Sequence, residues 1–324
     1  MRGSLITAGE RVLFESSLEW VMDLVAEGAG GELEHGDAPG VSLRVEVESD
    51  RRPFPTHGWE LLSRGAWRRN DEVVVENACT SGFDLRLRHT ADCAELTYRW
   101  RPPSRERAAA RLLRSRFHLL ARAVLMQYPV LWWAGRRGRA PLHASACATA
   151  ASTPLLTAPS GVGRSTLLIR ELAAGGRATG DNIAVGDGST VWGMVEPVRV
   201  EGAGGRRMPH GRHEAPLEDR AEWLAPDCLV VLRRGRHDDS ALSTCSADVA
   251  ARSLVTSTYM AGELRRYWPF AATLSAATGV GPAHPPVTEV AAAFASRLPC
   301  FSLALGRTSP TRLSDLLEAM EVAA

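Results

Sequence analysis

Towards its start the chain alternates apolar and polar side chains over short stretches, as in Leu43-Arg44-Val45-Glu46-Val47 and Leu85-Arg86-Leu87-Arg88. A period of two is typical of strands that have one face on a core and the other in water. On this basis we expect strands at residues 41–47, 72–76, 83–89 and 94–100, after a short helix at residues 13–26. The pattern predicts a small antiparallel, β-rich domain over residues 1–103.

A different pattern begins after Pro102-Pro103. Apolar residues recur at helical spacing from Arg105 to Gln127, and Ser104, with Glu106 close behind, is suited to cap the start of a helix. We therefore expect a long helix that links two domains, over residues 104–135. The segment also carries a row of arginines, at Arg105, Arg107, Arg111, Arg114 and Arg116. We interpret this row as a solvated helix face, and a face that binds phosphate or RNA is the alternative.

From Pro141 onwards, short apolar runs alternate with helical patterns, which is typical of an α/β domain. The runs predict strands at residues 143–148, 154–157, 178–185, 190–194, 229–232 and 301–305. Helices are expected at residues 165–174, 247–256, 287–295 and 311–320. The segment 202–220 is rich in Gly, Arg, His and Pro and is expected to be a mobile loop. We assign residues 136–324 to a second domain of the α/β class.

Composition narrows the classes of function. A chain of 324 residues is long enough for two domains. Its formal net charge of +1 removes the electrostatic argument for a dedicated nucleic-acid binder. The six cysteines form no CxxC pair and show no zinc-ligand spacing, and no apolar run is long enough for a secretory signal or a membrane span. We expect a cytoplasmic protein with neither a nucleic-acid nor a membrane partner.

The clearest local motif is Ala158-Pro159-Ser160-Gly161-Val162-Gly163-Arg164-Ser165-Thr166, which follows a predicted strand and opens a predicted helix. With lysine in place of Arg164 it would be a complete phosphate-binding loop. In such a loop glycines let the backbone close around phosphates, the cation reaches the β and γ oxygens, and a hydroxyl binds Mg²⁺. We predict that the nucleotide phosphates bind at Ser160, Gly161, Val162, Gly163, Arg164, Ser165 and Thr166. An ordinary glycine-rich turn is the alternative.

The arginine in this loop is part of a feature of the whole chain: the sequence contains no lysine, and the 38 Lys/Arg positions are all arginine. One interpretation is a coding bias that replaced lysines indiscriminately and damaged the loop. The other is that arginine was accepted at position 164 because a guanidinium also binds phosphate oxygens, two at a time. The sequence alone leaves both open.

Over residues 141–232 the chain resembles the HPr kinase family and the related kinases of lasso-peptide and other ribosomal-peptide gene clusters. Three elements carry the resemblance in the right order: Leu142-His143-Ala144-Ser145, then the loop from Leu155 to Thr166, then Gly175-Gly176-Arg177-Ala178-Thr179-Gly180-Asp181-Asn182. In that family a leucine–histidine pair precedes the loop, and a glycine-x-arginine segment leads to two consecutive aspartates. The resemblance implies a P-loop core of the PEP carboxykinase and HPr kinase type, and relatives that commonly form homo-oligomers.

The resemblance also implies a reaction: transfer of a phosphoryl group from ATP or GTP, with Mg²⁺, to a serine or threonine hydroxyl of a peptide or small protein. In this interpretation Asp181 accepts the proton of the acceptor or holds the metal, and Ser165 is the second metal ligand. His143 orients Asp181 or contacts the γ-phosphate, and Arg164 is the phosphate-binding cation. Arg199 is a further candidate contact for a phosphate or the substrate.

Two positions depart from the family pattern, since Arg164 replaces lysine and Asn182 replaces the second aspartate. An amide coordinates Mg²⁺ through its oxygen but brings no charge and cannot act as a base. The leading hypothesis is therefore a working peptide kinase that relies on one carboxylate. The alternatives are a nucleotide- or peptide-binding scaffold or regulator that has lost catalysis, and a small-molecule kinase or nucleotide hydrolase.

Overall fold

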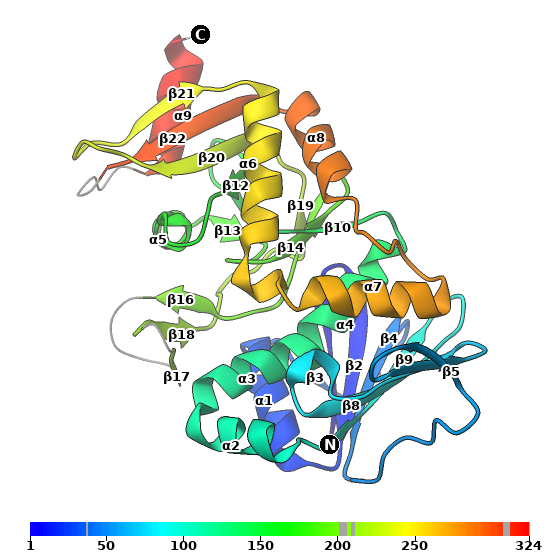
Figure 1. The fold of residues 1–324 in the computed structure, drawn as a ribbon. Coiled ribbons are helices and arrows are strands. Elements are labelled where there is room, and N and C mark those ends of the chain that lie inside the picture. The colour runs from blue at the N-terminus through cyan, green and yellow to red at the C-terminus, as the bar shows by residue number, and fades with distance from the viewer. Residues whose placement is uncertain (37, 201–205, 209–210, 307–311, 324) are drawn as a thin grey trace. The chain divides into compact units, whose positions relative to one another are not determined.

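The computed structural model describes residues 1–36, 38–200, 206–208, 211–306 and 312–323. It is a mixed α/β structure with several sheets (Figure 1). The chain divides into two compact units, and each is described by itself. Unit 1 comprises Met1–Arg137, Arg206–Arg212 and Arg266–Pro285, and unit 2 comprises Gly138–Gly205, His213–Arg265 and Pro286–Ala324.

Unit 1 is built on a nine-stranded sheet with the order β3-β1-β2-β4-β9-β8-β7-β6-β5. The strands are β1 (Arg2–Thr7), β2 (Glu10–Ser16), β3 (Glu34–His35), β4 (Leu43–Glu48), β5 (Glu60–Ser63), β6 (Ala66–Arg69), β7 (Glu72–Val75), β8 (Phe83–His89) and β9 (Ala94–Trp100). The pairs β2–β4 and β4–β9 are parallel. The expectation of an antiparallel sheet is therefore wrong, because the sheet is mixed.

The first strands also correct the helix expected at residues 13–26. Here β1 and β2 form a hairpin whose turn places Ala8 and Gly9 at positive φ, 53° and 73°. Helix α1 (Glu19–Ala29) begins only after β2 ends. An apolar run as short as Val12-Leu13-Phe14 fits a strand and a helix equally well, so the sequence pattern could not separate them.

Unit 1 also contains helices. They are α1, α2 (Ser104–Leu112), α3 (Arg114–Arg122), α4 (Tyr128–Gly135) and α7 (Tyr267–Thr278), with a π-helical turn at Ala123–Gln127 and a 3₁₀ turn at Ala78–Thr80. The long helix expected over residues 104–135 is thus interrupted. Leu113 leaves helical geometry with φ −118° and ψ 53°, and the π turn lies just before Pro129, whose ring nitrogen has no proton to donate.

Unit 2 contains a six-stranded sheet with the order β13-β11-β12-β20-β22-β21. Its strands are β11 (Ala144–Ala148), β12 (Pro154–Thr157), β13 (Arg177–Ala178), β20 (Cys228–Arg234), β21 (Ala241–Thr244) and β22 (Cys300–Leu305). The central trio β12, β20 and β22 is parallel. Strands β11, β12, β20 and β22 lie close to the predicted residues, because each is a short, largely apolar run, whereas β21 was not predicted.

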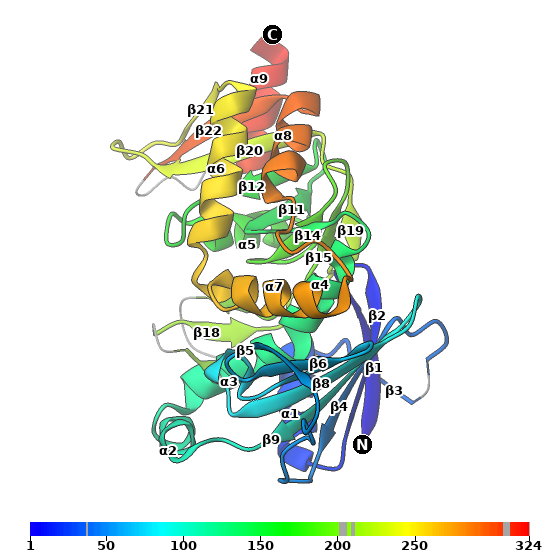
Figure 2. The same cartoon turned by 45° about the vertical axis from the view of Figure 1, so that its right-hand side comes forward.

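Helices lie on both faces of this sheet (Figures 1 and 2). They are α5 (Arg164–Ala173), α6 (Ala247–Met260), α8 (Val287–Arg297) and α9 (Leu313–Ala323), with a 3₁₀ turn at Gly262–Leu264. Leu156 and Val230 of the sheet pack in one cluster with Leu167 of α5 and Leu313 of α9. On the other face, Thr157 shares a hydrogen bond of 2.7 Å with Ser257 of α6.

A second, antiparallel sheet of unit 2 has the order β10-β14-β15-β19, formed by β10 (Ala140–Leu142), β14 (Ala184–Gly186), β15 (Val191–Gly193) and β19 (Trp223–Leu224). The single strand expected at residues 178–185 is divided between the two sheets, and the turn between β13 and β14 carries Asp181. In the segment expected as a loop at 202–220, β17 (Arg206–Arg207) and β18 (His213–Ala215) form, and β18 pairs with β16 (Val198–Val200). Residues 201–205 and 209–210 of that segment lie outside the described residues.

Candidate functional site

The glycine-rich segment lies between β12 and α5 in unit 2. Gly161 and Gly163 adopt positive φ values of 81° and 121°, which residues with a Cβ rarely adopt. A Cβ at Gly161 would meet no atom within 4 Å, so backbone conformation rather than crowding requires glycine there. Ser160, Gly161 and Thr166 are exposed, whereas Val162 and Gly163 are half-buried. The loop is therefore a surface turn directly ahead of a helix N-terminus.

Arg164, the first residue of α5, turns inward and is 6% exposed. Its Nη1 donates to the carbonyl oxygen of His143 at 2.8 Å, and its Nη2 lies 3.0 Å from Nε2 of the same histidine. Nη2 also lies 3.3 Å from both the backbone oxygen and Oδ1 of Asn182. The guanidinium therefore binds protein groups, and the two residues that depart from the family pattern contact each other.

His143 is held between β10 and β11 in its neutral form. Its backbone N–H donates to Thr258 Oγ1 at 3.0 Å. Burial, together with the positive charge of Arg164, lowers the pKa of His143 from 6.5 to about 3. Because a guanidinium only donates hydrogen bonds, the imidazole accepts at Nε2 and carries its proton on Nδ1. His143 thus helps to hold Arg164 and makes no hydrogen bond to Asp181 in this structure.

Asp181 and Ser165 lie side by side although they are far apart in the sequence. The Ser165 hydroxyl donates to Asp181 Oδ2 at 2.9 Å. Asp181 has no exposed surface, and its second oxygen, Oδ1, has no hydrogen-bond partner. A buried carboxylate oxygen without a donor is costly, and in native structures it usually marks a position for water, an ion or a ligand. The structure thus brings together the hydroxyl and the carboxylate that the resemblance names as candidate metal ligands.

The turn that carries Asp181 is fixed by a glutamate that the sequence reasoning missed. Glu196 Oε1 accepts the backbone N–H groups of Asn182 and Ile183 at 2.8 and 2.9 Å. Burial raises the pKa of Glu196 from 4.5 to about 7. Its contacts are tertiary and follow no motif; the only local signal is a carboxylate that ends the otherwise apolar run from Val191.

Further charges surround this cluster. Arg199 Nη1 binds Glu263 Oε1 at 2.7 Å in a partly buried ion pair, so Arg199 is not a free phosphate contact. Burial opposes the charged form of Arg199, but Glu263 and Glu196 outweigh it and raise its pKa. For Arg164, burial dominates and lowers the pKa.

A second missed residue lies on the exposed side of the loop. Arg234, at the end of β20, donates from Nη2 to the carbonyl oxygen of Gly161 at 2.7 Å. Both residues are exposed. Since Arg164 is turned inward, Arg234 is a cation beside the loop that is open to solvent. Only the parallel pairing of β12 with β20 brings Arg234 there, and no feature of the sequence near residue 234 indicates it.

The donor set suits a magnesium ion that retains water and phosphate ligands. No group of three or more His, Cys, Asp or Glu side chains suited to a metal occurs among the residues that the structure describes. Mg²⁺ at nucleotide sites needs fewer protein ligands, usually one or two oxygens in addition to phosphates. The unpartnered Oδ1 of Asp181 and the neighbouring Ser165 hydroxyl fit that requirement.

Comparisons with known proteins add no assignment to this site. No protein-family model matches the chain, and neither does any curated protein sequence. Within the described ranges, no helix has both the length and the apolar character needed to cross a membrane. The HPr kinase-like resemblance is therefore a hypothesis based on three short motifs and on the contacts among their residues.

Proposed function

We propose that this chain is a nucleotide-dependent phosphotransferase of the HPr kinase-like P-loop type, which uses Mg²⁺ with ATP or GTP. The acceptor in this proposal is a serine or threonine hydroxyl of a peptide or small protein. One observation carries the proposal: the 2.9 Å hydrogen bond between Ser165 and Asp181, which joins the residue after the loop cation to the first residue of the Asp-Asn pair. An ordinary glycine-rich turn has no need of this contact.

The residues of the chain have separable tasks in this mechanism. The loop amides from Gly161 to Ser165 bind the phosphate oxygens, and the N-terminus of α5 favours the negative charge. Ser165 and Asp181 hold the magnesium ion, which when bound neutralises charge on the phosphates. The acceptor oxygen forms a bond to the γ-phosphorus as the bond to the bridging oxygen breaks, and the nucleoside diphosphate leaves with the electron pair. The proton of the hydroxyl passes to Oδ2 of Asp181, the carboxylate oxygen that is not assigned to the metal.

Asp181 has no exposed surface, so this chemistry requires a local rearrangement when nucleotide binds. The hydrogen bond from Arg234 to Gly161 is exposed and weak enough to break. We propose that phosphate takes the place of Gly161 as the partner of Arg234 while the loop opens. The Arg164–His143–Asn182 contacts then support the turn from behind.

Calorimetry of the full chain with Mg²⁺-ATP and with Mg²⁺-GTP tests the first step. We expect at least one of them to bind, and Arg234→Ala to weaken binding about tenfold, since a hydrogen bond to a charged group contributes about 1.5 kcal/mol. The matched control is Arg233→Ala, because Arg233 binds Ser302 on the neighbouring strand. Absence of binding for both nucleotides overturns the proposal.

Mass spectrometry of mixed serine- and threonine-containing peptides, incubated with the chain and nucleotide, tests the transfer step. We expect a gain of one phosphoryl group that is lost in Asp181→Asn, while nucleotide binding persists. Asp187→Asn is the control, because Asp187 lies in a hairpin turn of the same unit and its carboxylate accepts hydrogen bonds from Ser189 and Thr190. Hydrolysis without any peptide product would instead identify a nucleotide hydrolase.

A second candidate function is a nucleotide-binding scaffold without catalysis. The observation that favours it is the commitment of Arg164 to His143 and Asn182, which withholds from the phosphates the cation that the motif normally supplies. The pair of variants Arg164→Lys and Asn182→Asp, alone and together, separates the two candidates. Loss of transfer from an active parent supports the kinase, whereas gain of transfer by an inert parent supports the scaffold.

A further inference from the structure

A cleft in unit 1 concentrates positive charge. It has a volume of about 510 Å³, and four arginines line it: Arg51, Arg101, Arg107 and Arg111. The rest of its wall is Trp100, Pro102 and Pro103, so no acidic side chain lines the cleft. Four like charges around one concave surface repel each other, and the low-dielectric wall strengthens their field. Such a surface favours an anionic ligand.

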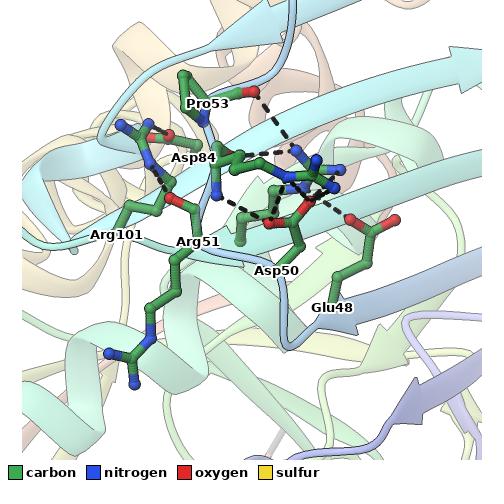
Figure 3. Close-up of polar contacts among 8 residues, drawn as sticks. Glu48, Asp50, Arg51, Pro53, Asp84 and Arg101 are labelled. Carbon is green, nitrogen blue, oxygen red and sulfur yellow. Dashed lines mark hydrogen bonds and ion pairs between the residues drawn. The ribbon is translucent and has the colours of Figure 1, made fainter.

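The guanidinium groups of Arg101 and Arg107 are oriented by hydrogen bonds to neighbouring protein groups. Arg101 donates from Nε to the carbonyl oxygen of Arg51 at 2.8 Å, and its Nη1 binds the carboxylate of Asp84 (Figure 3). Asp84, whose side chain is only 5% exposed, offsets the charge of Arg101, so Arg51, Arg107 and Arg111 supply the net positive charge of the cleft. Arg107 donates from Nη2 to the carbonyl oxygen of Pro102 at 3.2 Å. Cations that are already oriented lose less entropy when they bind an anion.

The other two arginines are exposed and carry no ion pair within the described part of the chain. The side chain of Arg51 points away from the polar contacts of its neighbours in Figure 3. Arg111 lies in the last turn of α2, a helix in which no residue is buried. The acidic residues nearest in sequence to Arg51, Glu48 and Asp50, already bind Arg99. Arg51 and Arg111 are therefore the cations of the cleft that are most available to a ligand.

The aromatic wall is rigid and suits a peptide. The ring of Trp100 contacts Trp20 at 5.4 Å and Phe117 at 6.1 Å between centroids, so its orientation is fixed. A fixed indole beside two prolines offers an apolar surface to a backbone and to aliphatic carbons, while planar guanidinium groups grip carboxylates through two hydrogen bonds. A nucleic acid would instead follow the row of arginines beyond the cleft, to Arg114 and Arg116, so these two residues distinguish the two kinds of ligand.

We propose that this cleft binds an acidic segment of a peptide or protein, with its Asp or Glu carboxylates on Arg51 and Arg111 and its backbone against Trp100. The site goes beyond the proposed function and does not depend on it, because every residue that forms it belongs to unit 1. Its ligand chemistry is a series of carboxylates spaced along an extended chain. Binding of this segment would bring an acidic protein to the molecule whether or not nucleotide is present.

Fluorescence anisotropy tests the proposal with a labelled peptide of alternating glutamate and glycine, added to the full chain without nucleotide. We expect saturable binding that weakens as salt rises, and no binding of the same peptide with glutamine in place of glutamate. The double variant Arg51→Ala/Arg111→Ala should raise the Kd about tenfold or more, since two charge-assisted contacts are lost. Arg114→Ala/Arg116→Ala is the matched control, because it removes the same charge from exposed positions outside the cleft.

Each other outcome contradicts the proposal. Equal binding of the glutamine peptide means that the carboxylates do not determine binding. If both double variants weaken peptide binding equally, the peptide is held by nonspecific electrostatic attraction to the surface and not by the cleft. Tighter binding of a labelled single-stranded oligonucleotide at the same salt concentration would identify a nucleic-acid site. Displacement of the peptide by inorganic phosphate at similar concentration would identify a site for small anions only.

Discussion

The contact between Arg164 and Asn182 links the two residues at which the chain departs from the HPr kinase-like motif. Random damage to a loop would leave a misplaced cation, yet this guanidinium has a defined set of acceptors, contributed by His143 and Asn182. The Nη2–Oδ1 distance of 3.3 Å indicates that position 182 is fitted to position 164. A carboxylate at residue 182 would place a further buried negative charge close to Asp181, and an amide avoids that repulsion. The two departures are therefore best treated as one change.

A double-mutant cycle tests this pairing. Arg164→Lys removes the two-pronged contact and leaves buried acceptors on His143 and Asn182 without donors, which should lower the free energy of unfolding by about 2 kcal/mol. Asn182→Asp gives the ammonium a charged partner, so we expect the double variant to recover about 1 kcal/mol of that loss. Denaturant unfolding measures both, with exposed Arg170→Lys as the control. Strict additivity would show that the two positions act independently.

At the scale of elements, the turn between β13 and β14 is held by contacts from distant strands. Gly193 of β15 passes so close that a Cβ there would lie 1.7 Å from the carbonyl oxygen of Thr179. Glu196 then binds two amides of the same turn. The position of Asp181 thus depends on Gly193 in β15 and on Glu196 just after it, and each residue provides a separate test.

Gly193→Ala should displace the backbone at Thr179 and destabilise unit 2 by about 3 kcal/mol, because the obstructing atom is backbone and cannot swing aside. The same shift should weaken nucleotide binding. Gly262→Ala is the neutral comparison, since a Cβ there meets no atom within 4 Å and its φ is not positive. Unfolding curves for the two variants measure the effect, and equal stability would contradict the close approach.

Glu196 predicts a dependence of stability on pH. Its pKa is about 7 in the folded chain and 4.5 as the ordinary value, so the folded state holds more protons between these values. The stability contributed by the protonated carboxyl is complete below pH 4.5 and is lost as the pH rises through 7, by about 3 kcal/mol. Glu196→Gln keeps the Oε1 acceptor without the charge. We expect it to be more stable than the parent at pH 8 and equal to it near pH 4.

The control for this measurement is Glu218→Gln, since Glu218 is exposed. The comparison uses the difference between variant and parent at each pH, because His143 contributes in the opposite direction. Its pKa is lowered to about 3, so its contribution to stability rises with pH between 3 and 6.5. A stability difference between Glu196→Gln and the parent that does not change with pH would show that Glu196 is already charged.

Some elements around the candidate site could be predicted from the sequence and others could not. The strand β12, the loop and α5 could be predicted, because each has a local signature: an apolar run, glycines at positive φ and a helical repeat that ends at Gly175. Helix α7 could not, since Tyr267–Thr278 is apolar on most sides and has Pro269 within it. Glu196 and Arg234 reach the site only through strand pairing and side-chain contacts, which a periodicity in one segment does not encode.

At the scale of the whole molecule, the two units have separate proposed ligands. Each unit is made of discontinuous segments of the chain, so the backbone passes repeatedly from one unit to the other. Unit 2 holds the nucleotide candidate, and unit 1 holds the arginine-lined cleft. Hydrogen exchange resolved by peptide mass spectrometry can follow the units individually.

We expect Mg²⁺-nucleotide to protect peptides of unit 2, such as those of α5, and the glutamate–glycine peptide to protect α2 and β9 of unit 1. A ligand at a hundred times its Kd stabilises the state it binds by about 2.7 kcal/mol, which is a large change in exchange rate. The variants Asp187→Asn and Arg114→Ala/Arg116→Ala serve as controls for the two units. Protection of the same segments by both ligands would contradict separate sites.

One contact behind the loop offers a way to observe that site without labels. Glu171, two turns along α5 from the loop, accepts the backbone N–H of Leu313 at 2.6 Å, and both residues are buried. Leu313 is the first residue of α9, so a carboxylate from one helix caps the start of the other. A displacement of α5 relative to α9 would change the length of this bond. The resonance of the Leu313 amide in a nitrogen–proton correlation spectrum therefore measures whether ligand binding at the loop moves α5.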